Sequence, residues 1–113
     1  MKRDMELIRK ILVAMEDHAK TTGLVALQFD GYSDDEVSYH VKLLADHGLI
    51  EATDCSTSYG FCWRARSLRW GGHDFIEAIR DESRWNSVKK WVMDAGKILT
   101  IETLKEAVKA LFL

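Results

Sequence analysis

The segment from residue 33 to residue 73 constrains this chain most, because its helix and turn signals follow one another in a fixed order. Ser33 and Glu36 have the spacing of a capping box, in which each side chain satisfies a backbone amide at the start of a helix. Apolar residues then recur at helical spacing, and Gly48 is a typical left-handed helix stop. The sequence therefore predicts a helix over residues 34–47.

A β-hairpin is predicted directly after this helix. Residues 49–55 and 61–68 are rich in strand-forming side chains, and the Ser, Thr, Tyr and Gly residues between them supply a turn. Side chains of the second run alternate between two faces, with Phe61, Trp63 and Ala65 on one and Cys62, Arg64 and Arg66 on the other. Gly71-Gly72 then begins a further helix.

More helices and one short strand are expected outside this segment. Residues 4–19 have the apolar spacing of a helix. Residues 24–29 form a short apolar run that is most easily explained as a strand, with a helical turn as the alternative that periodicity leaves open. After Gly71-Gly72, two helical patterns extend to Gly96 and form either two helices or one kinked helix. Thr100 caps a last helix, with an apolar stripe at Ile101, Leu104, Val108 and Leu111.

This order of elements is the one that a winged helix-turn-helix domain needs around its recognition helix and its wing. We therefore predict an α+β fold, with a small antiparallel sheet, a β-hairpin wing and extra C-terminal helices. The chain has 113 residues, of which 47% are hydrophobic, enough for a single domain with one core. Residues 1–82 are assigned to the core, with the wing at about 49–70, and residues 83–113 to a C-terminal helical extension.

Charge is spread unevenly along the chain. The net charge is −2, so the whole molecule does not attract nucleic acid electrostatically. Residues 21–54 carry seven acids against one lysine, whereas residues 55–70 carry three arginines and no acid. The predicted wing is therefore basic, and the predicted recognition helix begins in an acidic stretch.

The string Val37-Ser38-Tyr39-His40-Val41-Lys42-Leu43-Leu44 is followed by Gly48-Leu49-Ile50. It resembles the recognition helix of arsenical-resistance-type winged-helix repressors, which often read V-S-x-H-L-x-x-L and then G-L-V. This resemblance covers about a sixth of the chain and is more specific for the fold than for DNA. In the repressors a separate helix braces the recognition helix across the DNA backbone. Here residues 24–32 stand in its place, so that helix is short, extended or missing.

Other strings are spread over almost the whole chain. They are Met1-Lys2-Arg3-Asp4-Met5, Gly31-Tyr32-Ser33, Tyr39-His40, Leu68, Trp70, Gly72-His73, Phe75, Ala78-Ile79-Arg80-Asp81 and Trp85. In these positions the chain resembles a family of short bacterial and prophage proteins that form a domain of unknown function. The resemblance implies a winged-helix-like fold and a phage-derived origin, and it brings no known activity with it.

Double-stranded DNA is the first partner that this fold suggests. The residues expected to face outward from the 34–47 helix are Asp35, Ser38, Tyr39, Lys42 and Asp46. We predict Ser38, Tyr39 and Lys42 as readers of base edges, and Arg64, Arg66 and Arg69 in the 61–69 wing as phosphate contacts. The chain is then a small DNA-binding or transcription-regulatory protein.

A protein partner is the alternative. The acidic start of the 34–47 helix, the net negative charge and the missing brace helix favour a protein–protein interaction module on the same scaffold. The last helix offers a second such surface. One of its faces completes the core, and another either packs on a second copy as a homodimer or closes the monomer's own core.

The two cysteines give a third, redox or metal, interpretation. If residues 57–60 form the loop, Cys55 and Cys62 lie opposite each other, where they form a disulfide, contribute half of a metal site or stay reduced. Zinc needs about four ligands, and no CxxC or HxxxH pair is present, so we expect no metal and no cofactor, with reduced structural cysteines as the default.

An enzyme is not expected. The sequence lacks a Ser/His/Asp order, a nucleotide-binding glycine loop and a cluster of carboxylates. The start MKRDMELIRKIL has acids where a secretory signal needs an apolar run, and no apolar stretch approaches membrane-spanning length. We therefore expect a cytoplasmic location and no membrane partner.

Overall fold

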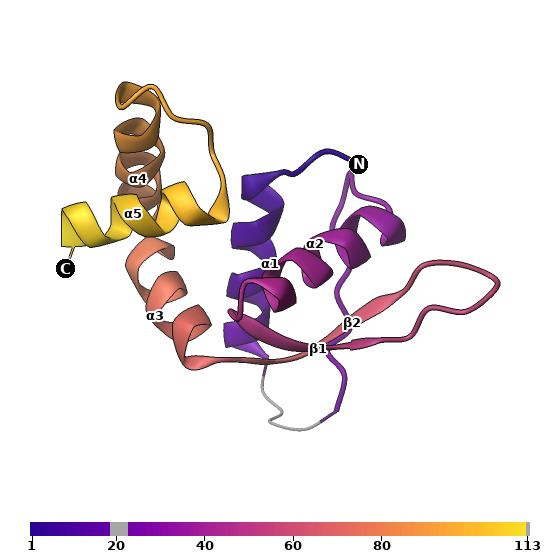
Figure 1. Cartoon of the computed structure of the whole chain (residues 1–113). Coiled ribbons are helices and arrows are strands. Elements are labelled where there is room, and N and C mark those ends of the chain that lie inside the picture. Colours follow the sequence, from indigo (N-terminus) through magenta and orange to yellow (C-terminus); the bar gives the residue numbers. More distant parts are fainter. Residues whose placement is uncertain (19–22, 113) are drawn as a thin grey trace.

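The computed structural model describes residues 1–18 and 23–112, which form five helices and one two-stranded antiparallel sheet (Figure 1). The helices are α1 (Met5–Asp17), α2 (Asp34–Asp46), α3 (Trp70–Ile79), α4 (Glu82–Asp94) and α5 (Ile101–Phe112), and the strands are β1 (Ile50–Asp54) and β2 (Trp63–Leu68). The predicted α+β class is confirmed. The predicted end of the first helix at Ala19 lies outside the described residues.

The helix α2 begins and ends as its sequence predicts. Ser33 Oγ accepts the amide of Glu36 at 3.1 Å, and the Glu36 carboxylate accepts the amide of Ser33 at 3.0 Å, which completes the capping box. Gly48 has a φ of 73°, a left-handed conformation that glycine adopts without strain, and it turns the chain into β1.

β1 and β2 pair in the predicted hairpin, and its loop projects away from the helices (Figure 1). The register joins Ile50 to Leu68 at one end and Asp54 to Trp63 at the other. Between Glu51 and Ala52 the register shifts, so that Arg66 is an extra residue in β2. Such a β-bulge bends its strand and redirects the extra side chain.

The predicted strand at 24–29 is wrong in its length. Val25 alone pairs with the sheet, through its amide and the carbonyl oxygen of Ala65 at 2.8 Å, on the side of β2 that β1 leaves free. The bulge directly after Ala65 interrupts the straight edge that a longer strand would need. From residue 23 to residue 33 the chain forms no helix, so the predicted brace position is extended.

The core is one continuous cluster that includes residues from every helix and both strands. Its largest fully buried side chain is Trp85 in α4, whose indole reaches Glu6 in α1. The helices α3, α4 and α5 lie together beside α1, on the side away from the hairpin (Figure 1). α3 and α4 are two helices, because Asp81 caps a new helix by accepting the amide of Arg84 at 3.0 Å.

α3 starts where the backbone packs too closely for any side chain at one position. A Cβ added at Gly72 would lie 2.1 Å from the carbonyl oxygen of Leu49, whereas one at Gly71 would meet Leu49 at an ordinary 3.5 Å. Only glycine therefore fits at residue 72, and it brings α3 against the turn between α2 and β1.

Candidate nucleic-acid interface

The predicted reader residues of α2 do not share one exposed face. The expectation that Ser38 faces outward is wrong, since Ser38 is 5% exposed and its hydroxyl donates to the carbonyl oxygen of Trp63 at 3.4 Å. The small side chain lets β2 lie close against α2, so Ser38 holds the hairpin to the helix. Tyr39 is half-buried and stacks edge-on against His40, with ring centroids 5.4 Å apart.

Lys42 is the one base of α2, and two neighbours already bind it. Its Nζ lies 2.7 Å from Asp46, one helical turn further on, and 5.8 Å from the centre of the Trp63 ring. The Lys42 ammonium group therefore contacts both α2, at Asp46, and the hairpin, at Trp63. A pair of this kind contributes little to stability at a solvated surface, and a phosphate can replace Asp46 as its partner.

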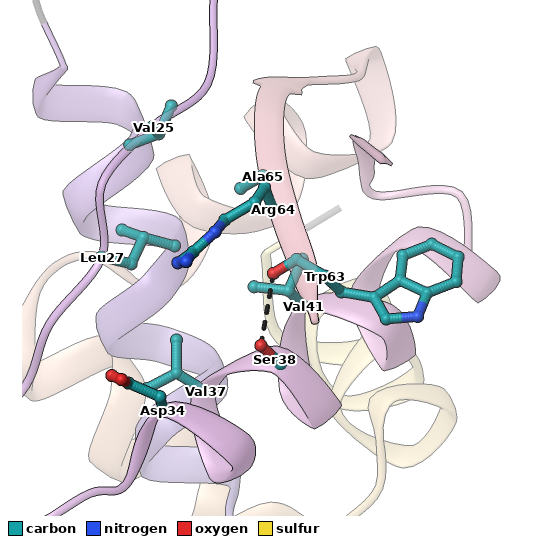
Figure 2. A pocket seen from close by; sticks show the side chains of 9 residues that line it. All are labelled: Val25, Leu27, Asp34, Val37, Ser38, Val41, Trp63, Arg64 and Ala65. Carbon is teal, nitrogen blue, oxygen red and sulfur yellow. Dashed lines mark hydrogen bonds between the residues drawn. The ribbon is translucent and has the colours of Figure 1, made fainter. Parts of the chain in front are cut away.

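Arg64 lines a shallow notch at the junction of three segments (Figure 2). The notch lies between the extended 24–29 segment, the first turns of α2 and β2, and Figure 2 shows the guanidinium directed toward Leu27. Asp34 lines the same notch from α2, yet within the described residues Arg64 forms no ion pair. Arg64 is thus an exposed cation that remains available to a partner.

Arg66 and Arg69 line a second depression, between the last turns of α2 and the edge of β1. Arg66 reaches across the hairpin and donates from Nε to Thr53 Oγ1, and Arg69 lies 3.7 Å from Glu51. Trp63 also lines this depression, together with Asp46, the partner of Lys42. The structure therefore brings Arg66 and Arg69 together beside Trp63 and places Arg64 apart from them.

The basic character of the wing is weaker in three dimensions than along the chain. β1 supplies two acids, Glu51 and Asp54, from positions paired with the arginine-bearing strand β2. Hydrogen bonds from Ser56 lower the pKa of Asp54. Counting these two acids against the three arginines leaves the hairpin at +1. Any anion that binds here meets a mixed surface, on which each cation except Arg64 has a neighbouring acceptor.

A buried cluster that sequence patterns did not predict holds α2 against α1. The amide of Asp4 donates to His40 Nε2 at 2.8 Å, while His40 Nδ1–H donates to the carbonyl oxygen of Glu36 at 2.7 Å. The hydroxyl of Tyr32 donates to the Asp4 carboxylate at 2.8 Å. His40 is 1% exposed, and both of its ring nitrogens have hydrogen-bond partners within the chain, so this histidine is a structural residue.

His47 joins the other end of α2 to α5. Its Nδ1 lies 2.8 Å from the carbonyl oxygen of Leu43 and its Nε2 lies 2.8 Å from the Glu102 carboxylate. Both partners are acceptors, so both contacts are hydrogen bonds only when the imidazole carries two protons. His40 and His47 are therefore occupied in holding α2 in place.

Most of the residues through which the chain resembles a family of unknown function hold the fold together. Asp4, Tyr32 and His40 form the cluster just described, Gly72 permits the close approach of α3, and Asp81 caps α4. Arg80 joins α3 to the end of α1 through Glu16 at 2.6 Å and Asp17 at 2.7 Å. Trp70 and His73 differ, because both are exposed, Trp70 at 86%.

The apolar stripe of α5 closes the chain's own core at Ile101, Leu104 and Val108. Three large apolar side chains of this region remain exposed: Met93, Ile98 and Leu111. The homodimer expected through the C-terminal helices stays a prediction. The predicted continuation of the stripe to Leu113 lies outside the described residues.

No group of three or more metal-ligating side chains is found in residues 1–18 and 23–112. In that same part of the chain, no helix is long and apolar enough to cross a membrane. Cys55 and Cys62 are free, half-buried thiols.

The chain belongs to the family described as "Hypothetical protein (DUF2513)", whose model matches residues 2–98. It is also similar to an "Uncharacterized protein" of Haemophilus influenzae (strain ATCC 51907 / DSM 11121 / KW20 / Rd). The two are 37% identical over 112 residues, which cover 98% of this chain and 95% of the relative. No solved structure matches the chain significantly. These matches establish the predicted membership of an uncharacterised family.

Proposed function

We propose that this protein is a small, non-enzymatic DNA-binding regulator with a winged-helix-like arrangement, which contacts double-stranded DNA through its hairpin. The convergence of Lys42, Arg66 and Arg69 around Trp63 carries the proposal. One cation comes from α2 and two come from the hairpin, as expected where a recognition helix and a wing contact one duplex.

The position of Val25 supports the winged-helix-like arrangement. In such a domain a short strand between the first and second helices pairs with the second wing strand. Val25 follows α1 and pairs with Ala65 of β2. The extended segment that continues to Ser33 then replaces the brace helix, so the phosphate contacts of that helix are absent from the proposed interface.

In this proposal the hairpin contributes most of the affinity. The phosphate contacts are made by Arg64, Arg66 and Arg69. Because Ser38 is buried, the readers of base edges that remain on α2 are Tyr39 and Lys42. Three phosphate contacts give a slope of log affinity against log salt of about −2.7. Binding is therefore weak and sensitive to salt, since Asp34, Asp35 and Asp46 repel the backbone. A cytoplasmic location and a phage-derived origin are parts of the same proposal.

The test is fluorescence anisotropy of a labelled duplex of mixed sequence, titrated with the whole protein at low and near-physiological salt. We expect binding at low salt that weakens steeply as salt is added. The double variant Arg66→Glu, Arg69→Glu should lose this binding and keep its circular dichroism spectrum. Lys90→Glu, Lys105→Glu makes the same change of charge at exposed positions of α4 and α5 and should bind nearly as the wild type does.

Equal affinity of the two double variants would remove the hairpin from the interface. No binding of the wild type at any salt, to mixed or to genomic sequence pools, would remove DNA from the proposal.

A protein partner is the second candidate, and the exposed surface of α2 favours it. Asp34, Asp35 and Asp46 are exposed along this helix, and its one lysine is neutralised. Such a surface is complementary to a basic segment of a partner. Self-association through the C-terminal helices stays a prediction beside it, and Met93, Ile98 and Leu111 are exposed in that region. Cross-linking in a cell extract, compared between wild type and an Asp34→Asn, Asp35→Asn variant, separates this candidate from DNA binding.

A further inference from the structure

The register of the hairpin places its two cysteines directly across from each other. The paired strands end at Asp54 and Trp63, and the next bridge joins Thr57 to Gly60. Between them the amide of Cys55 donates to the carbonyl oxygen of Cys62 at 2.8 Å. The Cys62 amide donates to Ser56 Oγ, so one backbone hydrogen bond joins the two cysteines. Residues opposite each other on antiparallel strands have Cα atoms about 4.5–5.5 Å apart. That spacing falls within the range of about 4.4–6.8 Å that a disulfide spans.

The side chains of the two cysteines are also close. The Cys55 thiol donates to the carbonyl oxygen of Thr53 at 3.6 Å. Removal from water raises the pKa of Cys55, and the adjacent Cys62 thiol raises it further, while Arg64 acts in the opposite direction. Directly opposite residues of an antiparallel pair project to the same face, so the hydrogen-bonded Cys55 and Cys62 extend their side chains to one side of the hairpin.

Ser56 further fixes this pair. Its hydroxyl accepts the amide of Cys62 at 2.8 Å and donates to the carbonyl oxygen of Cys62 at 3.2 Å. The six residues between the cysteines are thus already folded into a closed turn. Cross-linking the sulfur atoms then requires little rearrangement, because the chain ordering that a disulfide demands is already present.

We propose that Cys55 and Cys62 are a site of reversible oxidation, at which a low-molecular-weight disulfide such as oxidised glutathione converts the two thiols into one internal disulfide. Oxidation at this site does not depend on DNA binding. The site also differs from a metal site, which would need further ligands that the described residues do not bring to the hairpin.

The chemistry is two successive thiol–disulfide exchanges. One cysteine loses its proton, and its thiolate attacks a sulfur atom of oxidised glutathione, which breaks the glutathione S–S bond and releases one glutathione thiolate. The second cysteine, as thiolate, attacks the protein sulfur of this mixed disulfide and releases the second glutathione. The protein loses two protons and two electrons, and one molecule of oxidised glutathione becomes two of reduced glutathione.

The experiment equilibrates the whole protein in buffers of varied ratio of reduced to oxidised glutathione. Samples are quenched with acid, alkylated and weighed by mass spectrometry. We expect a monomeric product that lacks two hydrogens and takes up no alkylating reagent. The single variants Cys55→Ser and Cys62→Ser should each carry one glutathione in the most oxidising buffers and no internal disulfide.

The same titration in concentrated urea tests whether the folded hairpin is responsible. We expect the ratio of reduced to oxidised glutathione at half-oxidation to be at least about tenfold higher in the native chain, because the fold holds the thiols together. Equal midpoints in the two states, two glutathione adducts on the native wild type, or two alkylated thiols at every ratio would each overturn the proposal. Circular dichroism of the serine variants checks that they remain folded.

Discussion

The indole Nε1 of Trp85 donates to both carboxylate oxygens of Glu6, at 3.0 and 3.1 Å, and so joins α4 to the first turn of α1. Lys89 binds the same carboxylate at 2.6 Å. One acid therefore receives a tryptophan and a lysine from consecutive turns of α4. Because Trp85 is the largest fully buried side chain, this contact positions the C-terminal helices on the rest of the core.

Replacing Glu6 by Leu should destabilise the fold by about 1–3 kcal/mol, because the buried indole N–H loses its acceptor. Chemical denaturation with urea measures this change in the free energy of unfolding. Glu77→Leu, at an exposed position of α3, is the matched control and should change stability by less than about 0.5 kcal/mol. Similar losses in both variants would show that the Glu6 contact contributes nothing specific.

Acid should destabilise the protein through Asp4 and Glu6. Burial favours the protonated form of each carboxyl, but hydrogen bonds to the charged form outweigh burial, so both pKa values are lowered. At Asp4 these hydrogen bonds come from Tyr32 and two backbone amides. At Glu6 they come from Lys89 and Trp85. A lowered pKa in the folded state gives stability that is present above the unfolded value, near 4, and is lost as pH falls through the folded value.

The contribution of Asp4 and Glu6 to the free energy of unfolding should therefore be constant from about pH 7 to 5 and should fall below about pH 4. Urea denaturation across this range measures the slope. Tyr32→Phe removes the hydrogen bond to Asp4 and should reduce the loss of stability in acid, whereas Tyr59→Phe, at a fully solvated position, should leave it unchanged. Parallel slopes for all three proteins would contradict the assignment.

Replacing His40 by Leu should cost about 1–3 kcal/mol, because it leaves the Asp4 amide and the Glu36 carbonyl oxygen without their buried partner. His73→Leu makes the same chemical change at an exposed position and should be nearly neutral. Thermal unfolding at neutral pH compares the two. Equal melting temperatures would mean that water satisfies the Asp4 amide once the imidazole is gone.

Gly72 and Gly71 offer the sharpest comparison of neighbouring positions. Gly72→Ala should destabilise the protein by at least about 2 kcal/mol, since its Cβ would collide with the backbone at Leu49 and force α3 away. Gly71→Ala meets only ordinary contact and should be neutral or stabilising by up to about 1 kcal/mol, because alanine favours a helix. A lower denaturation midpoint for Gly71→Ala than for Gly72→Ala would refute the packing described for α3.

Local signals account for the parts of the fold that the sequence predicted. The capping box at Ser33 and the left-handed Gly48 delimit α2, and alternation together with the 57–60 turn predicts the hairpin. Each of these signals lies within a few residues, so periodicity and turn chemistry suffice to find it.

Contacts between distant residues account for most of what the sequence did not predict. A polar residue on a predicted helix face is expected in solvent, but Ser38 is covered because β2 packs directly over it. Asp4 and His40 are 36 residues apart, and no local pattern pairs them. The bulge at Arg66 depends on how β1 and β2 fit together, and it separates Arg66 from Arg64 in a way that alternation does not predict.

His40 and His47 are the same side chain on one helix, yet they attach that helix to different parts of the fold. His40 accepts the amide of Asp4, which precedes α1, whereas His47 contacts the carboxylate of Glu102 in α5. The helix that carries the proposed readers is thus fastened by one imidazole to the N-terminal helix and by the other to the C-terminal helix. Its position therefore depends on residues that lie 98 positions apart in the sequence, Asp4 and Glu102, and not on the hairpin alone.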